Sequence, residues 1–197
     1  AVSFADGEAR YVNRFVRTTA FEAEQVARGP LWAGTAEPAA LAQDPRSWGA
    51  RPGMKDPAST DVVVHAGKAL ATFYLCGQPY QLALDDLTTL GTATWEPAAG
   101  VSSHCKVDEE SGELFFFNYG VEPCLHYGVV DANEQLVHYT RVPLPGPRTP
   151  HDMAVSERYA IFNDFPLSWD ETLMRDKGLF IPKLHDPPSR FGVLDKR

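Results

Sequence analysis

The sequence contains little cysteine and no long apolar segment. Its three cysteines, Cys76, Cys105 and Cys124, form no CxxC pair, which argues against a disulfide framework and against a cysteine zinc site. No apolar run reaches about 18 residues, so we expect no stable insertion into a membrane. The N-terminus, AVSFADGEARY, lacks the basic and apolar regions of a signal peptide. The simplest interpretation is a protein of a reducing, cytoplasmic compartment.

Basic residues are scarce as well. Eighteen Lys and Arg residues stand against 26 Asp and Glu residues, which gives a net charge of -8. This balance argues against nucleic acid as a partner. Common catalytic signatures are also absent, since the chain has no GxSxG elbow, Walker loop, GxGxxG or HExxH motif. The function must therefore rest on other residues.

Turn residues and short strand-like segments are plentiful. Sixteen prolines and 15 glycines are spread through 197 residues, and acidic or glycine turns separate the short apolar runs. We predict a hairpin within 1–18, a helix at 19–27, and a loop at 28–56 with a helical turn near 39–42. Many short strands joined by turns favour an all-β sandwich, barrel or propeller. The predicted strands are 61–65, 69–75, 79–84, 114–118, 125–130, 136–141, 153–155, 159–163 and 190–194.

Two histidines stand where a loop leads into a strand. His104 lies in the stretch 100–120, GVSSHCKVDEESGELFFFNYG, and His151 follows the proline-rich loop PLPGPRTP. They are 47 positions apart (151 − 104), about the length of one four-stranded propeller blade. Two side chains placed one blade apart would face a common channel, so we predict a metal site there. Their Nε2 atoms should then lie about 3 Å apart; if the two rings merely pack, they would face different sides of a sheet.

The remaining candidates are better explained by structure. We expect packed or exposed structural roles for His65, His126, His138 and His185, with His185 in solvent. The carboxylates of 108–113 resemble the acid pair of a glycosidase, but a charged, solvated turn is the simpler interpretation. Cys105 is a weak candidate nucleophile because adjacent residues of a strand point to opposite sides.

Several stretches resemble the carotenoid cleavage oxygenase family. VSSHCKVDEESGEL is similar to the family motif S-A-H-P-K-x-D-x-x-T-G-E, and LPGPRTPHDMAVSERYAIFNDFPL is similar to its second histidine motif. YVNRFVRTTAF, STDVVVHAGKALATFYLCGQPYQL and SRFGVLDKR extend the resemblance along nearly the whole chain. NYGVEPCLHYGVVDANEQLVHYTRVPLPGPRTPHDMA most resembles the bacterial stilbene-cleaving members, the lignostilbene dioxygenases.

The resemblance implies a seven-bladed β-propeller with a non-haem ferrous ion, Fe(2+), held by four histidines. By motif match, His104 and His151 would be the first two ligands, and the other two would lie beyond the end of this sequence. Residues 1–197 would then be an internal piece, about the first half of the domain with three to four blades, and inert by itself. The implied reaction splits a conjugated C=C bond of a stilbenoid or apocarotenoid with dioxygen into two carbonyl products. A non-catalytic binding propeller and an isomerase-type relative are the alternatives.

The sequence departs from the family pattern in places. Cys105 replaces the proline that follows the first histidine. Many members carry a Glu, hydrogen-bonded to an iron ligand, in the strand that matches ATFYLCG, and this chain has no carboxylate there. Stilbene-cleaving members carry a lysine near this strand that binds the phenol group of the substrate. Lys68 and Tyr74 lie near that position in this sequence, and neither is a clear match for the lysine. Phe116, Phe162 and Phe165 could line an alkene tunnel, although core packing is the favoured role for each.

Overall fold

Antiparallel strands form most of the structure. The computed structural model describes residues 1–49, 52–97, 99–186 and 188–196. Within these ranges the strands form two sheets of four strands, one sheet of three and two of two. The predicted all-β class is therefore confirmed.

The two four-stranded sheets are meanders, the arrangement of a propeller blade, in which each strand pairs with the next one along the chain. The first sheet consists of β3 (Asp61–His65), β4 (Lys68–Thr72), β5 (Tyr80–Leu82) and β6 (Thr89–Thr92). The second consists of β7 (Lys106–Val107), β8 (Leu114–Tyr119), β9 (Cys124–Val130) and β10 (Leu136–Pro143). The third sheet joins β11 (Met153–Val155), β12 (Tyr159–Asp164) and β15 (Arg190–Asp195).

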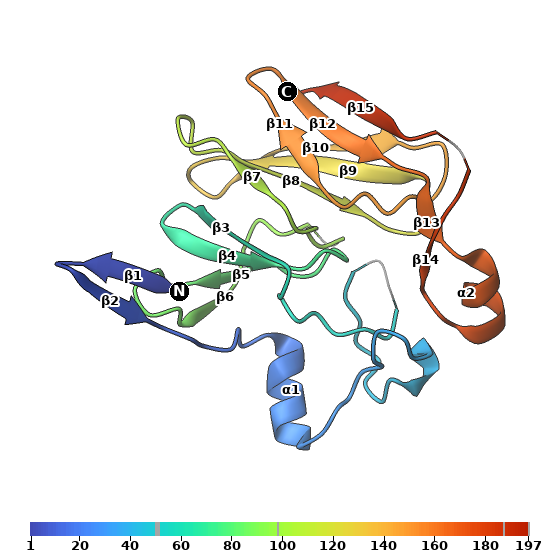
Figure 1. The fold of residues 1–197 in the computed structure, drawn as a ribbon, viewed down its shortest axis with the longest axis horizontal. Coiled ribbons are helices and arrows are strands. Elements are labelled where there is room, and N and C mark those ends of the chain that lie inside the picture. The colour runs from blue at the N-terminus through green and yellow to red at the C-terminus, as the bar shows by residue number, and fades with distance from the viewer. Residues whose placement is uncertain (50–51, 98, 187, 197) are drawn as a thin grey trace.

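The first strands of these three sheets lie next to one another. β7 contacts both β3 and β11, and Figure 1 shows it between them. The segments that lead into these strands therefore approach one another, although they come from distant parts of the sequence. This arrangement positions the site described below.

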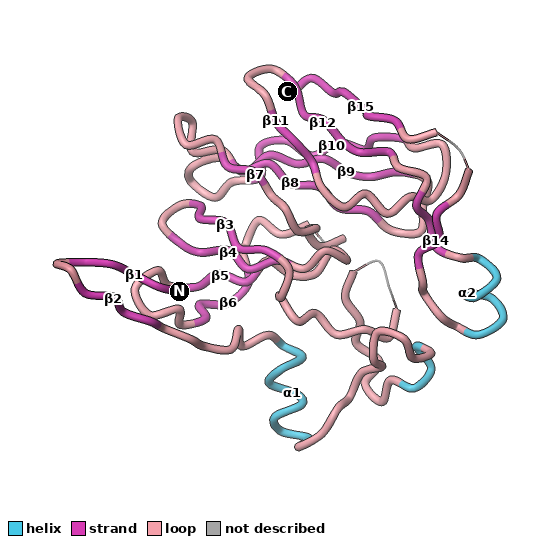
Figure 2. The backbone as a smooth tube through the Cα atoms, viewed as in Figure 1, coloured by secondary structure: helices cyan, strands magenta, loops and turns pink. Residues whose placement is uncertain are grey.

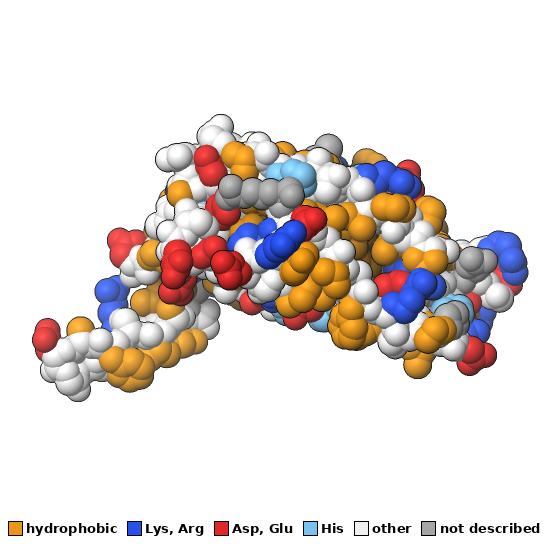
Figure 3. Space-filling model, turned by 90° about the horizontal axis from the view of Figure 1, so that it is seen from above, with side chains coloured by type: hydrophobic (Ala, Val, Ile, Leu, Met, Phe, Trp, Pro, Cys, Tyr) orange, Lys and Arg blue, Asp and Glu red, His pale blue; other side chains and the backbone are white. Residues whose placement is uncertain are grey.

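The other elements lie around the three sheets (Figure 2). The N-terminal hairpin of β1 (Val2–Ala5) and β2 (Glu8–Tyr11) precedes helix α1 (Thr19–Ala27) and the short 3-10 helix η1 (Ala39–Leu41). Between β12 and β15 the chain inserts β13 (Leu167–Trp169), α2 (Glu171–Lys177) and β14 (Pro182–Leu184). The hairpin projects from the body with apolar side chains exposed (Figure 3), among them Phe4. Among the described residues, no helix is long and apolar enough to cross a membrane.

Most predicted elements are confirmed, with shifted ends, and several were missed. The predicted strand at 69–75 ends earlier, because β4 stops at Thr72 and the next residues form a turn. β6, β7, β13 and β14 were not predicted, and each has four residues or fewer. Helix α2 was also missed, although both of its caps are visible in the sequence: the Asp170 carboxylate accepts from the Leu173 N–H at 3.0 Å, and Gly178 ends the helix with φ +63°.

Strand β8 is buried on both faces and joins the sheets. Phe115 and Phe117 face the third sheet and pack with Tyr127 and Phe162. Phe116 points the other way, toward the first sheet, and contacts Trp95 with ring centroids 5.3 Å apart. Side chains alternate along a strand, so a continuous aromatic run can serve two interfaces at once.

A buried carboxyl group anchors the long loop to the first sheet. Asp56 is 1% exposed, and its oxygens accept from the Ala58 N–H at 2.8 Å and the Gln78 N–H at 2.5 Å. A Cβ at Gly77 would lie 2.3 Å from this carboxylate, so glycine makes room for it. Burial raises the pKa of Asp56 to about 6, although the two N–H donors act in the opposite direction.

We expect Asp56 to make the protein less stable as the pH rises. The pKa in the folded state lies above the ordinary value of 3.8, so its stabilising contribution is full below about pH 4 and is lost as the pH passes about 6. Between pH 4 and pH 7, the free energy of unfolding measured with urea should fall by about 2–3 kcal/mol because of this group. The pH dependence should be flatter in Asp56→Asn and unchanged in Glu109→Gln, where the carboxylate is exposed. Equal slopes in all three proteins would contradict the prediction.

Candidate metal centre

The loop before β7 is fixed by backbone contacts. Gly100 has φ +73°, and a Cβ there would lie 2.1 Å from the Cys76 carbonyl oxygen, so glycine is required. The Val101 N–H donates to the Gly77 carbonyl at 2.9 Å. The Ser102 N–H donates to the Phe117 carbonyl at 2.8 Å, and the Ser102 hydroxyl donates to the Tyr74 carbonyl at 3.0 Å. The loop is therefore attached to both the first and the second sheet.

His104 follows these anchors with an unusual backbone conformation. Its φ is +61°, in the left-handed region that a residue with a Cβ rarely adopts. Such strain persists where the surrounding structure enforces it, and it is common at functional sites. The His104 side chain is 27% exposed, so one side of the ring is packed and the other is accessible.

His151 is linked to the same region by an ion pair. Asp152, its neighbour, accepts from the Lys106 ammonium group at 2.8 Å and from the Met153 N–H at 2.7 Å. Lys106 is the first residue of β7, so this pair joins the two loops that carry the histidines. His151 itself is exposed.

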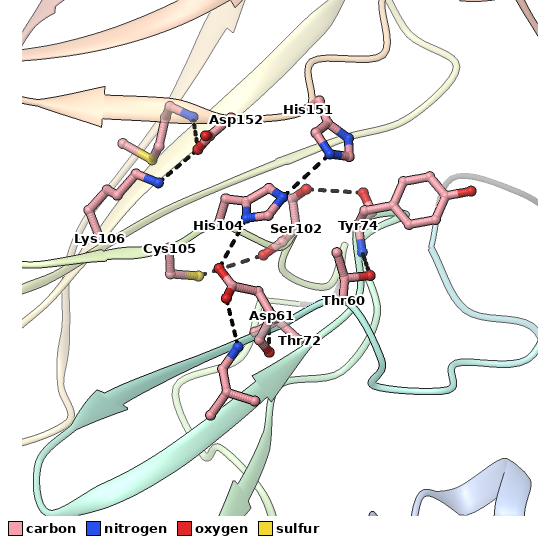
Figure 4. Close-up of polar contacts among 12 residues, drawn as sticks. Thr60, Asp61, Thr72, Tyr74, Ser102, His104, Cys105, Lys106, His151 and Asp152 are labelled. Carbon is pink, nitrogen blue, oxygen red and sulfur yellow. Dashed lines mark hydrogen bonds and ion pairs between the residues drawn. The ribbon is translucent and has the colours of Figure 1, made fainter. Parts of the chain in front are cut away.

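The two imidazole rings converge. The Nε2 atom of His104 lies 3.4 Å from the Nε2 atom of His151, and the ring centroids are 5.0 Å apart. Figure 4 shows both rings pointing into the same space, although they come from different sheets. The two rings thus have the arrangement expected from the sequence, with facing nitrogens rather than opposite faces of a sheet.

A third residue, Asp61, contacts the His104 ring and was missed in the sequence. Its Oδ2 atom lies 3.0 Å from Nδ1 of His104, and its Oδ1 atom accepts from the Val62 N–H at 2.8 Å. Asp61 is the first residue of β3, so it occupies the same kind of position as the histidines, where a loop leads into a first strand. Its position at the start of a predicted strand was the feature of the sequence that could have identified it. His104 lies between Asp61 and His151 in Figure 4.

The donor set fits a metal ion of the kind that imidazole binds. A carboxylate on Nδ1 makes that nitrogen the N–H donor and leaves the lone pair on Nε2. Two imidazole nitrogens on one metal, each about 2.1 Å away at roughly 90–110°, are about 3.0–3.4 Å apart, as observed here. In the described part of the chain, no group of three or more His, Cys, Asp or Glu side chains is placed to hold a metal. These residues therefore offer part of a site.

The other sequence candidates lie elsewhere. Each of the remaining histidines has a structural contact: His65 with the Gly112 carbonyl at 3.0 Å, His185 with the Ser168 hydroxyl at 2.7 Å, and His126 and His138 with tyrosine rings. His185 is exposed, as predicted. Glu109 and Glu110 are exposed in the acidic turn, as the solvated-turn interpretation predicts, whereas Glu113 is buried, at 7% exposed, so that interpretation is wrong for Glu113. Burial raises the pKa of the Cys105 thiol to about 12, which rules against a nucleophile.

An apolar hollow of about 360 Å³ adjoins His151. Phe165, Leu167 and Phe191 line it, and Phe165 is 41% exposed. Phe116 and Phe162 are core residues, as favoured from the sequence, but the core role favoured for Phe165 is wrong because that ring is exposed at the hollow.

The two residues near the expected phenol-binding position differ in their surroundings. The ring of Tyr74 lies 6.0 Å from that of His151, between centroids. Lys68 instead forms an ion pair with Glu134.

Comparison with known proteins identifies the family. Residues 1–197 match the family described as retinal pigment epithelial membrane protein, RPE65. The chain belongs to this family, the carotenoid cleavage oxygenases. It is 29% identical to a carotenoid 9,10(9',10')-cleavage dioxygenase 1 of Pisum sativum and 28% identical to an isoeugenol monooxygenase of Pseudomonas nitroreducens. These alignments cover 97% and 100% of the chain but only 38% and 41% of the relatives.

Solved structures of this family share the fold. The crystal structure of Pseudomonas brassicacearum lignostilbene dioxygenase matches with a TM-score of 0.82 and 27% identity, over 99% of this chain and 41% of that one. Cobalt-substituted Synechocystis apocarotenoid oxygenase matches with a TM-score of 0.77 and 22% identity, over 99% of this chain and 44% of that one. The chain thus has part of a carotenoid oxygenase β-propeller, and it spans about two fifths of the length of its curated relatives.

Proposed function

We propose that the protein containing this chain is an iron(II)-dependent dioxygenase that cleaves a conjugated C=C bond into two carbonyl products. The observation that carries the proposal is the convergence of His104 and His151, whose Nε2 atoms are 3.4 Å apart, in a member of this family. His104 and His151 would hold the ion, with further ligands supplied from outside the described residues. We also propose a cytoplasmic location, supported by three free, buried cysteines.

The residues of this chain contribute ligation and positioning. Asp61 contacts Nδ1 of the His104 ring, and the Lys106–Asp152 ion pair keeps the two histidine loops together. Imidazole ligands suit iron, which would supply the activation of dioxygen. Both oxygen atoms of dioxygen enter the products, so RCH=CHR' and dioxygen give RCHO and R'CHO with no further reductant.

The proposed substrate is a small apolar or phenolic alkene, a stilbenoid or an apocarotenoid. The apolar hollow beside His151 supports this class, because its phenylalanine and leucine side chains favour an aryl or polyene group. Relatives of both kinds are similar to this chain: a carotenoid cleavage dioxygenase of Pisum sativum and a lignostilbene-alpha,beta-dioxygenase of Sphingomonas paucimobilis.

Oxygen uptake with the full-length protein tests the proposal. With ferrous iron and a hydroxystilbene or an apocarotenal, we expect one dioxygen consumed for each pair of aldehyde or ketone products, and no uptake after chelation of the metal. Geometric isomerisation without uptake would instead indicate an isomerase-type relative. Tight binding of the alkene with no turnover would indicate a non-catalytic propeller, and either result would overturn the proposal.

The 197-residue chain alone is expected to be inactive. Only two converging imidazoles lie within its described residues, and we propose that the remaining ligands come from the rest of the protein. The same uptake assay, run on this chain and on the full-length protein at equal concentration, should give turnover only with the latter. Turnover by the isolated chain would contradict this expectation.

A further inference from the structure

Asp61 and His104 are far apart in the sequence but in contact in the structure. The two residues are 43 positions apart and come from the first strand of one sheet and the loop before the first strand of the next. The Oδ2–Nδ1 distance is 3.0 Å, and Nε2 of the same ring faces His151 at 3.4 Å. The ring therefore has one nitrogen directed to a carboxylate and the other to the centre of the candidate site (Figure 4).

The carboxylate is itself held in place. Its second oxygen, Oδ1, accepts from the Val62 N–H at 2.8 Å, and the backbone carbonyl of Asp61 accepts from the Thr72 hydroxyl at 3.4 Å. In the described structure, no lysine or arginine forms an ion pair with Asp61, whose side-chain partner is His104. Such an arrangement points to an oriented imidazole rather than to a general surface ion pair.

His151 has different surroundings. Among the described residues no carboxylate contacts its ring, and its neighbours there are His104 and the Tyr74 ring. Carboxylate support in this part of the protein is therefore directed to His104.

We infer that Asp61 is the positioning residue of His104: its carboxylate accepts the Nδ1 proton, fixes the ring orientation and keeps the Nε2 lone pair free for the metal. This inference rests on the proposed function, because it assigns the role of one residue at that site. A carboxylate on the distal nitrogen also increases the basicity of the ligating nitrogen, and its loss typically lowers metal affinity about 10–100-fold.

Metal affinity provides the first test. Equilibrium dialysis of the full-length protein against Co²⁺, a redox-stable probe, should give a dissociation constant about 10–100-fold higher in Asp61→Ala than in the wild type. Asp61→Asn keeps an acceptor and should be intermediate, and Asp61→Glu should restore much of the affinity. Asp176→Ala, which breaks an exposed Arg175–Asp176 ion pair on α2, is the matched control and should bind as the wild type does.

Two further measurements separate positioning from a structural role. The affinity loss of Asp61→Ala should disappear in a His104→Asn background and persist in a His151→Asn background, since Asp61 acts through His104. In the metal-free protein, ¹⁵N NMR of labelled histidines should place the His104 proton on Nδ1, and Asp61→Ala should remove that signal.

The possible outcomes distinguish the two proposals. If the wild type binds no Co²⁺, the proposed metal site fails, whereas the NMR signal still tests the Asp61–His104 contact. If the wild type binds Co²⁺ and Asp61→Ala binds it equally well, the role of Asp61 is overturned. An affinity loss of the same size in the His104→Asn background would also overturn it.

Discussion

His104→Asn is expected to weaken metal binding strongly and to abolish alkene cleavage while leaving the fold intact. The loss removes an imidazole ligand, so the affinity for Co²⁺ or Fe²⁺ should fall by more than the roughly 100-fold seen when an outer partner of a ligand is lost. Asparagine is the replacement of choice because the backbone of His104 has φ +61°, and asparagine tolerates the left-handed region better than most residues. Metal stoichiometry and oxygen uptake would measure the effect, with the melting temperature as the check on folding.

His151→Asn should behave in the same way, since its Nε2 atom shares the space in front of His104. His138→Asn is the matched control, because that ring lies against Tyr127, with centroids 5.8 Å apart, and not at the site. Full stoichiometry and turnover in His104→Asn would show that His104 only packs.

The site could be predicted from the sequence only in part. His104 and His151 were recognisable because each stands at the end of an irregular segment, one blade length apart, before an apolar strand. Asp61 also precedes such a strand, but its role depends on the packing of β3 beside β7. A contact between side chains of different sheets leaves no periodic signal in either segment, so this partner emerged only from the structure.

The fold was predicted best where hydrophobic patterns are long. β8 and β9 have six and seven residues, and their apolar runs gave their positions to within a residue or two. β7 has only two residues, too few for any alternation to be read. β13 and β14 pair through only three residues each, and α2 lies between them in the chain. These strands are also too short for an alternating pattern to be recognised.

Phe117→Ala is expected to cost about 3–5 kcal/mol of stability, as is typical for the removal of a fully buried aromatic ring. Phe117 is 1% exposed, and its ring meets that of Phe162 edge-on at 6.0 Å, across the contact between the second and third sheets. Its backbone carbonyl also accepts from the Ser102 N–H at 2.8 Å, in the loop that leads to His104.

The cost arises at the contact between the sheets that present His104 and His151, so this packing bears directly on the candidate site. Urea unfolding of the wild type and the variant would measure it, with Val137→Ala as a control, because Val137 is exposed on β10 and should change stability by less than about 0.5 kcal/mol. The two sheets bring Nε2 of His104 and Nε2 of His151 to 3.4 Å, so loosening their interface should also weaken Co²⁺ binding without removing a ligand. A stability loss below about 1 kcal/mol would mean that the sheets are held together elsewhere and that Phe117 does not join them.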